Sequence, residues 1–358
     1  MKRNLKTIIR EKNPGVFLLL RTIRRMIKKD DCYLQRALAL GDSANCDYLE
    51  LLHNGTKDYG KTIYVITENS PNEGFCATLR FIIWLIIFAQ QHGFAPVIRL
   101  SEDFAYYDKD MRTKCSNPWE YYFLSSEESF DENIALNVCY SRYYHMMTMK
   151  EYSALDAYSL KNYYNRQAFR ICSPIINKYM RLKPEIIKES SALLEKEKNG
   201  KILGVHFRGT DYKNCNNDHP VFIDEDRMIS EIDKALEATG LSTVFLATDD
   251  AAFPSRIKSS FRNIRFLQHP DVFRSNGNTS VAFSKSSRKY HKYLLGYEIA
   301  RDMYTLSLCD GLVAGKSSVS FMSNLYKHSR NEEYEYMKII DNGNNKNDNE
   351  FIRPTGDR

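Results

Sequence analysis

The 358-residue sequence predicts an α/β protein in which two Rossmann-like domains face one another across a cleft. Two observations lead to this fold class. Strand-like and helix-like segments alternate from residue 201 to residue 327, which is typical of a parallel, doubly wound sheet. A shorter strand–helix–strand unit begins at Lys61, and each unit has a turn that would face the cleft.

The first α/β unit is expected to start with an apolar strand, followed by a turn rich in helix breakers and a long apolar helix. Residues 103–170 are rich in Tyr and irregular, apart from a late helical run. The expected strand, helix, second strand and late helical run lie at 62–67, 75–92, 95–100 and 151–170.

The second unit is the more regular one, and its alternation predicts a parallel sheet covered by helices. Its segments, alternately strand and helix, are 201–207, 224–238, 243–248, 252–260, 264–268, 289–308, 311–314 and 317–327. The predicted domains are a basic, partly helical segment over 1–60, an N-terminal α/β domain over 61–180, a C-terminal Rossmann-like domain over 181–330 and a polar tail over 331–358.

The net charge of +6 is concentrated at the start of the chain. Basic residues crowd residues 1–30 around the apolar run Val16–Leu20, which predicts either an amphipathic helix on an anionic membrane surface or a solvated helix packed on the body. No stretch is long enough to span a bilayer and no signal-peptide pattern is seen. The protein is therefore expected in the cytoplasm, either free or peripheral at the inner face of the membrane.

Composition argues against two other classes of site. The eight cysteines form no CxxC pair and no Cys/His cluster with zinc spacing, so reduced thiols and no metal site are expected. The basic residues sit in one short segment without an RNA-binding motif, so nucleic-acid binding is not expected.

The motif KILGVHFRGTD, at residues 201–211, is the most informative part of the sequence. It reads as a buried strand that ends in His206, Arg208 and Asp211, and open α/β sheets build ligand sites at such strand ends. His206 and Arg208 point to one face of the strand because they are two residues apart. The planar fork of an arginine suits a phosphate group, although both side chains are also compatible with a structural role.

Two further strand ends carry polar groups. Asp249 and Asp250 follow the strand at 243–248 and fit a metal site, a helix cap or a group that orients Arg208; capping and orienting are favoured. Ser317 and Ser318 follow the strand at 311–314 and open a helix. A P-loop is excluded there because Asp310 stands where the motif requires its first glycine. The amides at the start of the helix and the two hydroxyls still form an anion-binding site.

Two more positions belong to the predicted site. The turn at Gly74 and Phe75 leads into the long helix of the first unit, where glycine would let the backbone approach a phosphate. Asp302 lies on a predicted amphipathic helix and suits either the protein surface or the N1–H and N2 amino groups of a guanine.

Together these segments resemble the GDP-fucose-dependent α1,6-fucosyltransferases and, more distantly, the α1,2- and protein O-fucosyltransferases. The resemblance covers roughly residues 60–330. It is carried by GVHFRGTD (204–211), His219–Pro220, FLATDD (245–250), Asp302 eight residues before Asp310, Ser317–Ser318 and, more loosely, EGFCATLR (73–80).

The resemblance implies a GT-B-like fold and an inverting transfer of L-fucose from GDP-β-L-fucose to a hydroxyl of a glycan acceptor, without a metal or other cofactor. Domain 181–330 would bind the GDP-sugar and domain 61–180 would lie on the acceptor side. Arg208 would bind the β-phosphate, and Ser317 and the Gly74 turn would hold the pyrophosphate. His206 and Asp302 would meet the guanine end. The implied donor-binding residues are Gly74, Phe75, His206, Arg208, Asp249, Asp250, Asp302, Ser317 and Ser318.

The chain departs from the family pattern at three places. Gly209 stands where the family has a second Arg, Tyr212 stands where it has Lys, and the loop 213–220 has no clean match for its base-like Glu. The candidate catalytic residues are therefore Arg208, Asp211 and Asp218, with Asp218 the nearest carboxylate for the base and Asp211 the alternative.

Three functions stay open on the sequence. The first is fucosyl transfer in bacterial surface-glycan or lipid-linked oligosaccharide assembly. The second is transfer from another GDP-sugar or in another linkage, such as α1,2. The third is a non-catalytic GDP-sugar-binding protein.

Overall fold

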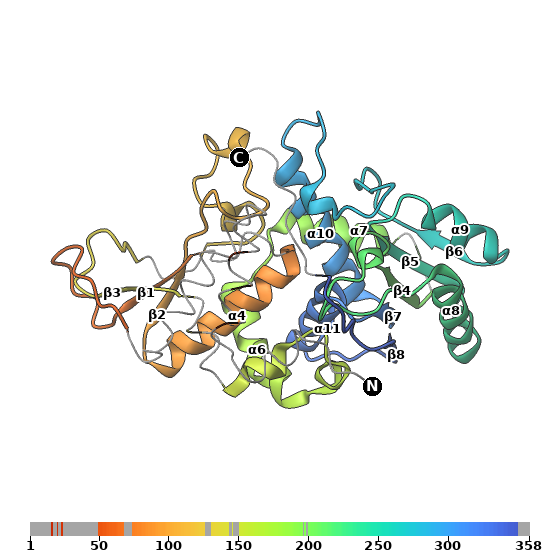
Figure 1. Cartoon of the computed structure of the whole chain (residues 1–358), viewed down its shortest axis with the longest axis horizontal. Coiled ribbons are helices and arrows are strands. Elements are labelled where there is room, and N and C mark those ends of the chain that lie inside the picture. Colours follow the sequence, from red (N-terminus) through yellow and green to blue (C-terminus); the bar gives the residue numbers. More distant parts are fainter. Residues whose placement is uncertain are drawn as a thin grey trace.

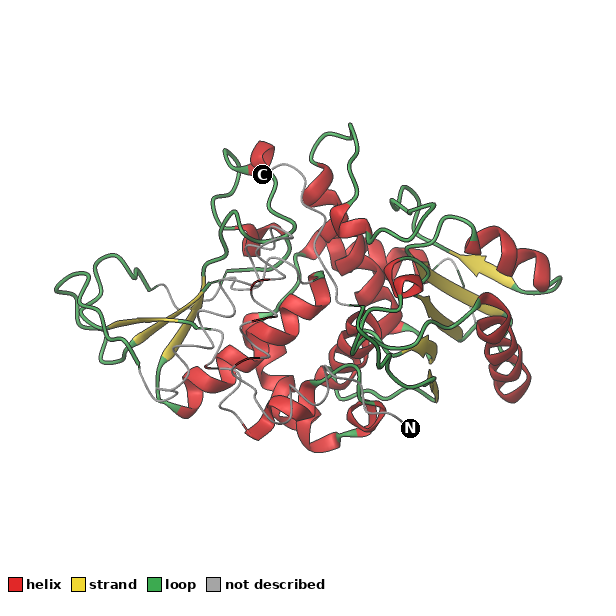
Figure 2. Cartoon of the chain, viewed as in Figure 1, coloured by secondary structure: helices red, strands yellow, loops and turns green. Residues whose placement is uncertain are grey.

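The computed structural model describes residues 16, 20, 23, 49–67, 74–125, 130–142, 145, 150–195, 197 and 200–349. Within them the chain forms two parallel sheets with helices gathered between and around them, which confirms the predicted α/β class (Figures 1 and 2). Most of the predicted basic segment 1–60 and the last residues, 350–358, lie outside the described residues.

The smaller sheet has the order β2–β1–β3, with β1 (Ile63–Ile66) between β2 (Ala95–Ile98) and β3 (Val138–Tyr140), and all pairs are parallel. Both faces of β1 are buried, as is typical of a parallel strand covered on two sides. The strands predicted at 62–67 and 95–100 are confirmed. β3 was not predicted, because its three residues lie in a segment that the sequence indicated to be irregular.

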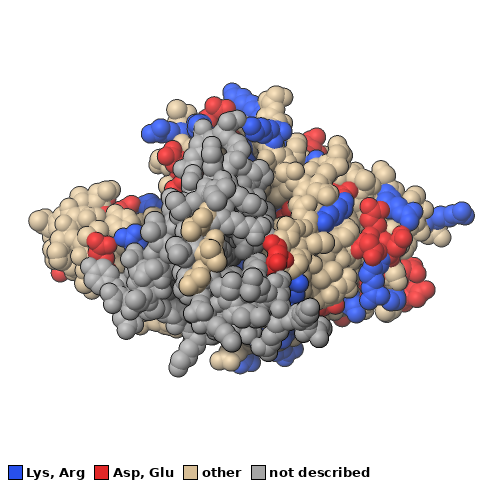
Figure 3. All heavy atoms as spheres, viewed as in Figure 1, with Lys and Arg blue, Asp and Glu red and all other residues tan. Residues whose placement is uncertain are grey.

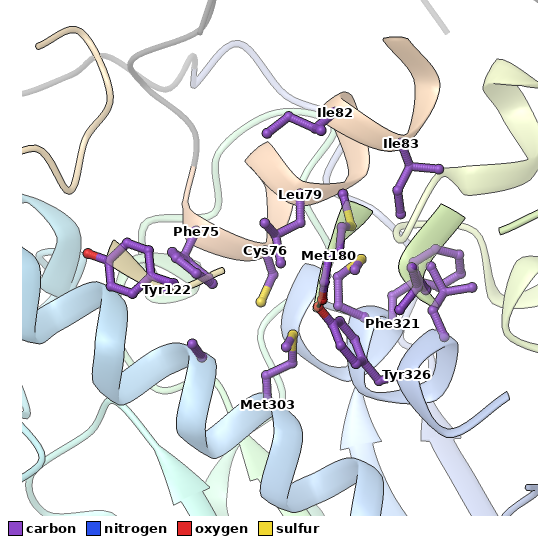
Figure 4. Packing of buried hydrophobic residues seen from close by; sticks show 14 of the residues in the cluster. Phe75, Cys76, Leu79, Ile82, Ile83, Tyr122, Met180, Met303, Phe321 and Tyr326 are labelled. Atoms are coloured by element: carbon purple, nitrogen blue, oxygen red, sulfur yellow. Dashed lines mark hydrogen bonds between the residues drawn. The ribbon is translucent and has the colours of Figure 1, made fainter. Parts of the chain in front are cut away.

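Helix α4 (Phe75–Gln91) is the helix predicted over 75–92, and it packs in the middle of the molecule against α10 (His291–Leu308) and α11 (Ser318–Ser329). A helix that is apolar on all sides belongs in a core. Figure 4 shows Phe75 and Cys76 directed from α4 toward the α10 and α11 side. No helix in the described part of the chain is both long and apolar enough to cross a bilayer.

The larger sheet has the order β6–β5–β4–β7–β8, and every pair in it is parallel. Its strands are β4 (Ile202–Phe207), β5 (Thr243–Thr248), β6 (Arg265–Leu267), β7 (Gly311–Gly315) and β8 (Tyr336–Ile340). From β4 the chain first builds the sheet outward through β5 and β6, and then returns to β7 on the other side of β4. The strand order therefore reverses between β4 and β7, and ligands bind at the carboxyl ends of strands at such a switch point.

Helices cover both faces of this sheet. Successive residues of a strand point to opposite faces, so a strand in the middle of the sheet can contact helices on both sides. Leu203 and Val205 of β4 pack with Ile232 of α8 (Glu225–Thr239), whereas Phe245 and Ala247 of β5 pack on the side of α10. α9 (Phe253–Ser260) follows β5. The predicted strands and helices of this unit are confirmed, with ends within two residues of the expected positions.

The remaining elements correct two expectations. The helical run predicted over 151–170 is wrong, since that stretch holds short 3₁₀ turns and α-helix begins only at Arg166. Further elements are α6 (Arg166–Tyr179), α7 (Pro184–Leu194) and the 3₁₀ turns Lys109–Met111, Pro118–Tyr121, Lys150–Leu155, Leu160–Tyr164, Asp211–Asn214 and Val281–Phe283.

The predicted polar tail over 331–358 is also wrong in part, because it contains strand β8. Residues beyond β8 then bind the loop that follows β4. The amides of Asp218 and Val221 donate to the carbonyls of Asn345 at 2.9 Å and Gly343 at 3.0 Å. This segment is therefore part of the folded body as far as residue 349.

One hydrophobic cluster extends across the predicted domain border at 180/181. It runs from Tyr64 and Ile66 of β1, through α4, to Phe321 of α11 and Leu312 of β7. The border itself stays a prediction. On the outer face that carries α8 and α9, acidic and basic side chains are interspersed, as with the pair Arg256–Asp226 at 2.9 Å (Figure 3).

Candidate functional site

The structure brings three strand ends together at the switch point of the larger sheet. Arg208 directly follows β4, Asp249 directly follows β5, and Lys316 directly follows β7. β4 pairs with both β5 and β7, so these three residues lie on one edge of the sheet. The three strand ends that the sequence singled out thus belong to one region.

Arg208 is held by two carboxylates. Its Nη2 lies 2.7 Å from Asp211 Oδ1 and its Nη1 lies 2.9 Å from Asp249 Oδ2. Nη2 also donates to the hydroxyl of Ser280 at 3.3 Å. Burial by itself would lower the pKa of Arg208, but the two carboxylates raise it, so the guanidinium is charged. A guanidinium has five N–H groups, and the contacts with Asp211, Asp249 and Ser280 use three of them. The side chain is 22% exposed, so the other two N–H groups are left for a ligand.

Asp249 fixes the backbone after β4 as well as the arginine. It accepts the amide of Gly209 at 2.9 Å and the hydroxyl of Thr210 at 2.6 Å. Gly209 itself has no room for a side chain, because a Cβ there would lie 2.5 Å from the Cβ of Asp250. A larger residue at position 209 would therefore clash with Asp250.

Asp250 has a different task from Asp249. Its Oδ1 accepts the amides of Ala252 at 2.8 Å and Phe253 at 3.1 Å, which confirms the expected cap of α9, and its Oδ2 pairs with Lys213 at 2.9 Å. The pKa of Asp250 is lowered: burial opposes this, but the hydrogen bonds from Lys213 and the two amides outweigh it. In the described part of the chain, no group of three or more His, Cys, Asp or Glu side chains is placed to hold a metal ion.

His206 connects β4 to the start of α11. Its Nδ1 lies 3.3 Å from the hydroxyl of Ser317, which caps α11 by accepting the amide of Ser320 at 3.1 Å. Burial, together with the charge of Arg208, lowers the pKa of His206 to about 3, so its ring is neutral at physiological pH. Ser318 opens α11 and is partly buried. Its amide, in the first turn, has no acceptor within the helix.

The start of α4 approaches the same region from the smaller sheet. The amide of Phe75 donates to the hydroxyl of Tyr106 at 3.0 Å, and the charge of Arg208 acts on the pKa of Tyr106, which burial raises. Gly74 has an ordinary negative φ of −67°, and a Cβ at this position would meet no atom within 4 Å. The fold itself therefore does not require glycine at position 74.

Asp302 lies on α10 and is partly buried. Burial raises the pKa of its carboxyl to about 7, although the neighbouring Arg301 and Arg274 lower it and Glu298 raises it further. A carboxyl group that titrates near neutral pH is typical of functional sites.

The two carboxylates considered for the base occupy different environments. Asp211 is buried and contacts Arg208, and the hydroxyl of Thr210 donates to it at 3.2 Å. Asp218 is exposed, with a positive φ of 64°, and accepts the side chain of Asn217 at 2.8 Å. Of these two carboxylates, Asp211 contacts Arg208, whereas no ion pair or hydrogen bond between described residues joins Asp218 to it.

The sequence missed several residues of this region because their partners are remote in the chain. Lys316 is buried and its Nζ lies 2.6 Å from Asp341 Oδ1 and 2.6 Å from Asn344 Oδ1. A small pocket opens beside these groups. It is lined by Phe207, Arg208, Tyr212, Pro220, Val221, Ile223, Met228, Gly315, Lys316, Ile340 and Asn342.

Comparison with known proteins gives a likeness only to solved structures. No family model and no curated protein matches the chain. The fucosyltransferase NodZ from Bradyrhizobium is 16% identical, with 75% of this chain and 92% of that chain covered and a TM-score of 0.41. NodZ α-1,6-fucosyltransferase soaked with GDP-fucose is 15% identical, with 74% of this chain and 92% of that chain covered and a TM-score of 0.42. POFUT1 in complex with GDP is 12% identical, with 79% of this chain and 99% of that chain covered and a TM-score of 0.43.

Proposed function

We propose that this protein is an inverting, metal-independent glycosyltransferase that moves L-fucose from GDP-β-L-fucose to a hydroxyl of a glycan acceptor. The observation that carries the proposal is the position of Arg208. Its guanidinium lies at the switch point of the larger sheet, is fixed by Asp211 and Asp249, and keeps N–H donors for an anion. This is the place and the chemistry that a nucleotide diphosphate requires.

Arg208 would stabilise the leaving group. When the bond from fucose to GDP breaks, negative charge develops on the β-phosphate, and donors that are already oriented stabilise it without reorganisation. Asp211 and Asp249 hold the guanidinium in place, and the first-turn amides of α11 add further donors. These groups supply oriented hydrogen-bond donors to the leaving phosphate without a metal ion.

Asp302 and His206 would recognise the guanine of the nucleotide. An ionised carboxylate accepts both the N1–H and the N2 amino group of guanine, a pattern that uracil and adenine do not offer. Asp302 is ionised above a pH of about 7. His206 is a neutral ring whose Nδ1 faces Ser317, so its Nε2 is the nitrogen for the donor nucleotide.

The base that activates the acceptor hydroxyl is Asp211 or Asp218, and two variants separate them. The Asp211→Asn change removes a partner of Arg208, so it should weaken GDP binding as well as turnover. Asp218→Asn leaves the Arg208 contacts intact and should lower kcat alone if Asp218 is the base. Normal kcat in Asp218→Asn would exclude Asp218 and leave Asp211 as the candidate for the base.

The donor class is tested by thermal shift with GDP, UDP and ADP at equal concentrations. A ligand present at 100 times its Kd stabilises the fold by about 2.7 kcal/mol, so specific stabilisation by GDP is easily seen. Fucosyl transfer should then persist in excess EDTA. Activity that EDTA abolishes and Mn²⁺ restores would refute metal independence, and GDP binding without transfer or hydrolysis would favour a non-catalytic binding protein.

A place at the membrane and in bacterial glycan assembly is part of the same proposal. Val16, Leu20 and Ile23 are helical and exposed, and their spacing of four and three residues places them on one side of a helix. The basic residues around them would favour anionic lipid. Co-sedimentation with vesicles that contain anionic lipid, but not with neutral vesicles, tests this contact.

A further inference from the structure

Arg80 of α4 is a buried cation, and two of its nitrogens have no hydrogen-bond acceptor in the described part of the chain. Only 6% of the residue is exposed, and its Nε and Nη1 have no hydrogen-bond partner. A buried guanidinium is costly unless a carboxylate or another anion accepts its N–H groups. None of the ion pairs between described residues includes Arg80. Within the described residues, therefore, no carboxylate compensates the charge of this guanidinium.

Aromatic rings surround this guanidinium. Its central carbon lies 6.0 Å from the ring of Phe81, 5.7 Å from that of Trp84 and 5.9 Å from that of Tyr158. Cation–π contacts at the edge of the useful range offset only part of the lost hydration. They also leave the in-plane N–H donors unused, and a planar fork of this kind pairs best with a carboxylate or phosphate.

Arg80 and Arg208 lie at the two ends of a row of three aromatic rings, those of Tyr158, His219 and Tyr212. The ring of Tyr158, which faces Arg80, lies 5.4 Å from that of His219, and His219 lies 6.1 Å from Tyr212. Arg208 in turn lies 5.8 Å from the ring of Tyr212.

A second link comes from Cys76, one turn before Arg80 on α4. Burial raises the pKa of this thiol, while the charges of Arg80 and Arg208 both oppose the rise. Arg80 likewise opposes the burial-driven rise in the pKa of Tyr163, whose hydroxyl accepts the amide of Ser317 at the start of α11. The charge of Arg80 therefore acts on Tyr163, a residue that contacts the start of α11.

The charge balance around Arg208 needs such a cation. In the ion pairs around Arg208 the carboxylates outnumber the cations, so this region offers a diphosphate no net positive charge. The ion pairs join Arg208, Lys213 and Lys316 to Asp211, Asp249, Asp250 and Asp341. Among the described residues Arg80 has no carboxylate partner, and it can supply the missing charge.

We infer that Arg80 is a second diphosphate-binding residue of this protein, whose guanidinium donates to a phosphate oxygen of the nucleotide from the α4 side while Arg208 donates from the side of β4. The inference rests on the proposed function, since it takes a nucleoside diphosphate as the ligand. It adds a residue of the first α/β unit to the donor site, which then closes between the two sheets.

The test compares Arg80→Met and Arg80→Lys with the wild type by calorimetric titration of GDP and of guanosine, which lacks phosphate. We expect Arg80→Met to weaken GDP binding about 10- to 100-fold and guanosine binding less than about 2-fold, by the usual strength of charged hydrogen bonds. Arg80→Lys, which keeps a charge but not the fork, should fall between them. Arg166→Met is the matched control, because Arg166 is exposed and pairs with Glu333 at the surface.

A role in packing alone would give a different result. Equal losses for GDP and guanosine, or unchanged GDP binding in both Arg80 variants, would overturn the inference while the proposed function stands. A wild-type protein that binds no GDP would overturn both. If Arg80→Met does not fold, Arg80→Lys decides alone, and GDP binding as tight as in the wild type would then refute the phosphate contact.

Discussion

The carboxyl group of Asp302 makes the stability of this protein depend on pH in a direction opposite to most aspartates. Burial raises its pKa from 3.8 to about 7. A difference of one in pKa corresponds to about 1.4 kcal/mol, so the whole difference is worth up to about 4 kcal/mol. Because Asp302 is partly exposed and solvent screens its charge, we expect about 2–4 kcal/mol.

The sign follows from proton binding. The folded protein holds the Asp302 proton more tightly than the unfolded chain does, so the contribution of this group to stability is fully present below a pH of about 4. It is lost as the pH rises to about 7, where the folded protein must also release the proton. Asp302→Asn cannot ionise, and it should keep its stability over this range.

The assay is urea denaturation of the wild type and Asp302→Asn at pH values between 4.5 and 8. The free energy of unfolding of the wild type, relative to the variant, should fall by about 2–4 kcal/mol over this range. Other titrating groups are common to both proteins and cancel in the difference. Asp226→Asn serves as the control for removing a carboxylate from the surface, because Asp226 is 82% exposed. A constant difference for Asp302→Asn would refute the assignment of a raised pKa.

Four further predictions concern the donor site. GDP affinity should rise about 10-fold between pH 6 and pH 8, because guanine requires the ionised form of Asp302, and calorimetry of Asp302→Asn should show weak, pH-independent binding. Arg208→Lys should lower kcat by about 100-fold or more while circular dichroism shows a folded protein, and full activity would contradict the leaving-group role. Gly74→Ala should leave the melting temperature unchanged, since the added methyl meets open space, but should weaken GDP binding; unaltered binding would show that no phosphate approaches this backbone. Lys316→Met should lower the free energy of unfolding, measured by urea denaturation, by about 1–3 kcal/mol, because it breaks the contact with Asp341. Protease cleavage after residue 340 should also become faster, and equal cleavage rates would argue against this contact as a tie.

The sequence predicts most of the fold, because strands and helices with a strong apolar pattern can be recognised from a few neighbouring residues. The strand that carries His206, its two neighbours and the long helix that begins at Phe75 are all found where expected. β3 and β8 escaped detection for physical reasons. β3 has only three residues, too few for a periodic pattern, and β8 is an edge strand with Lys338 and two half-buried residues beside it.

The candidate site was predictable where its residues follow strands. Parallel strands deliver their carboxyl ends to one edge, so Arg208, Asp249 and Ser317 had to lie near each other once the sheet was recognised. The division of labour between the two adjacent carboxylates was not predictable, since Asp249 holds the arginine and Asp250 caps α9. Only the backbone path after β5 separates these roles.

The sequence by itself therefore determined the fold class, the order of the elements and the polar strand ends, because these depend on neighbours a few residues apart. The tertiary structure alone decided which charges are compensated. It buries Arg80 with no carboxylate partner among the described residues, raises the pKa of Asp302 and ties Lys316 to a segment that the sequence indicated to be a tail. Burial and ion pairing depend on residues far apart in the chain, and no local pattern records which of them will meet.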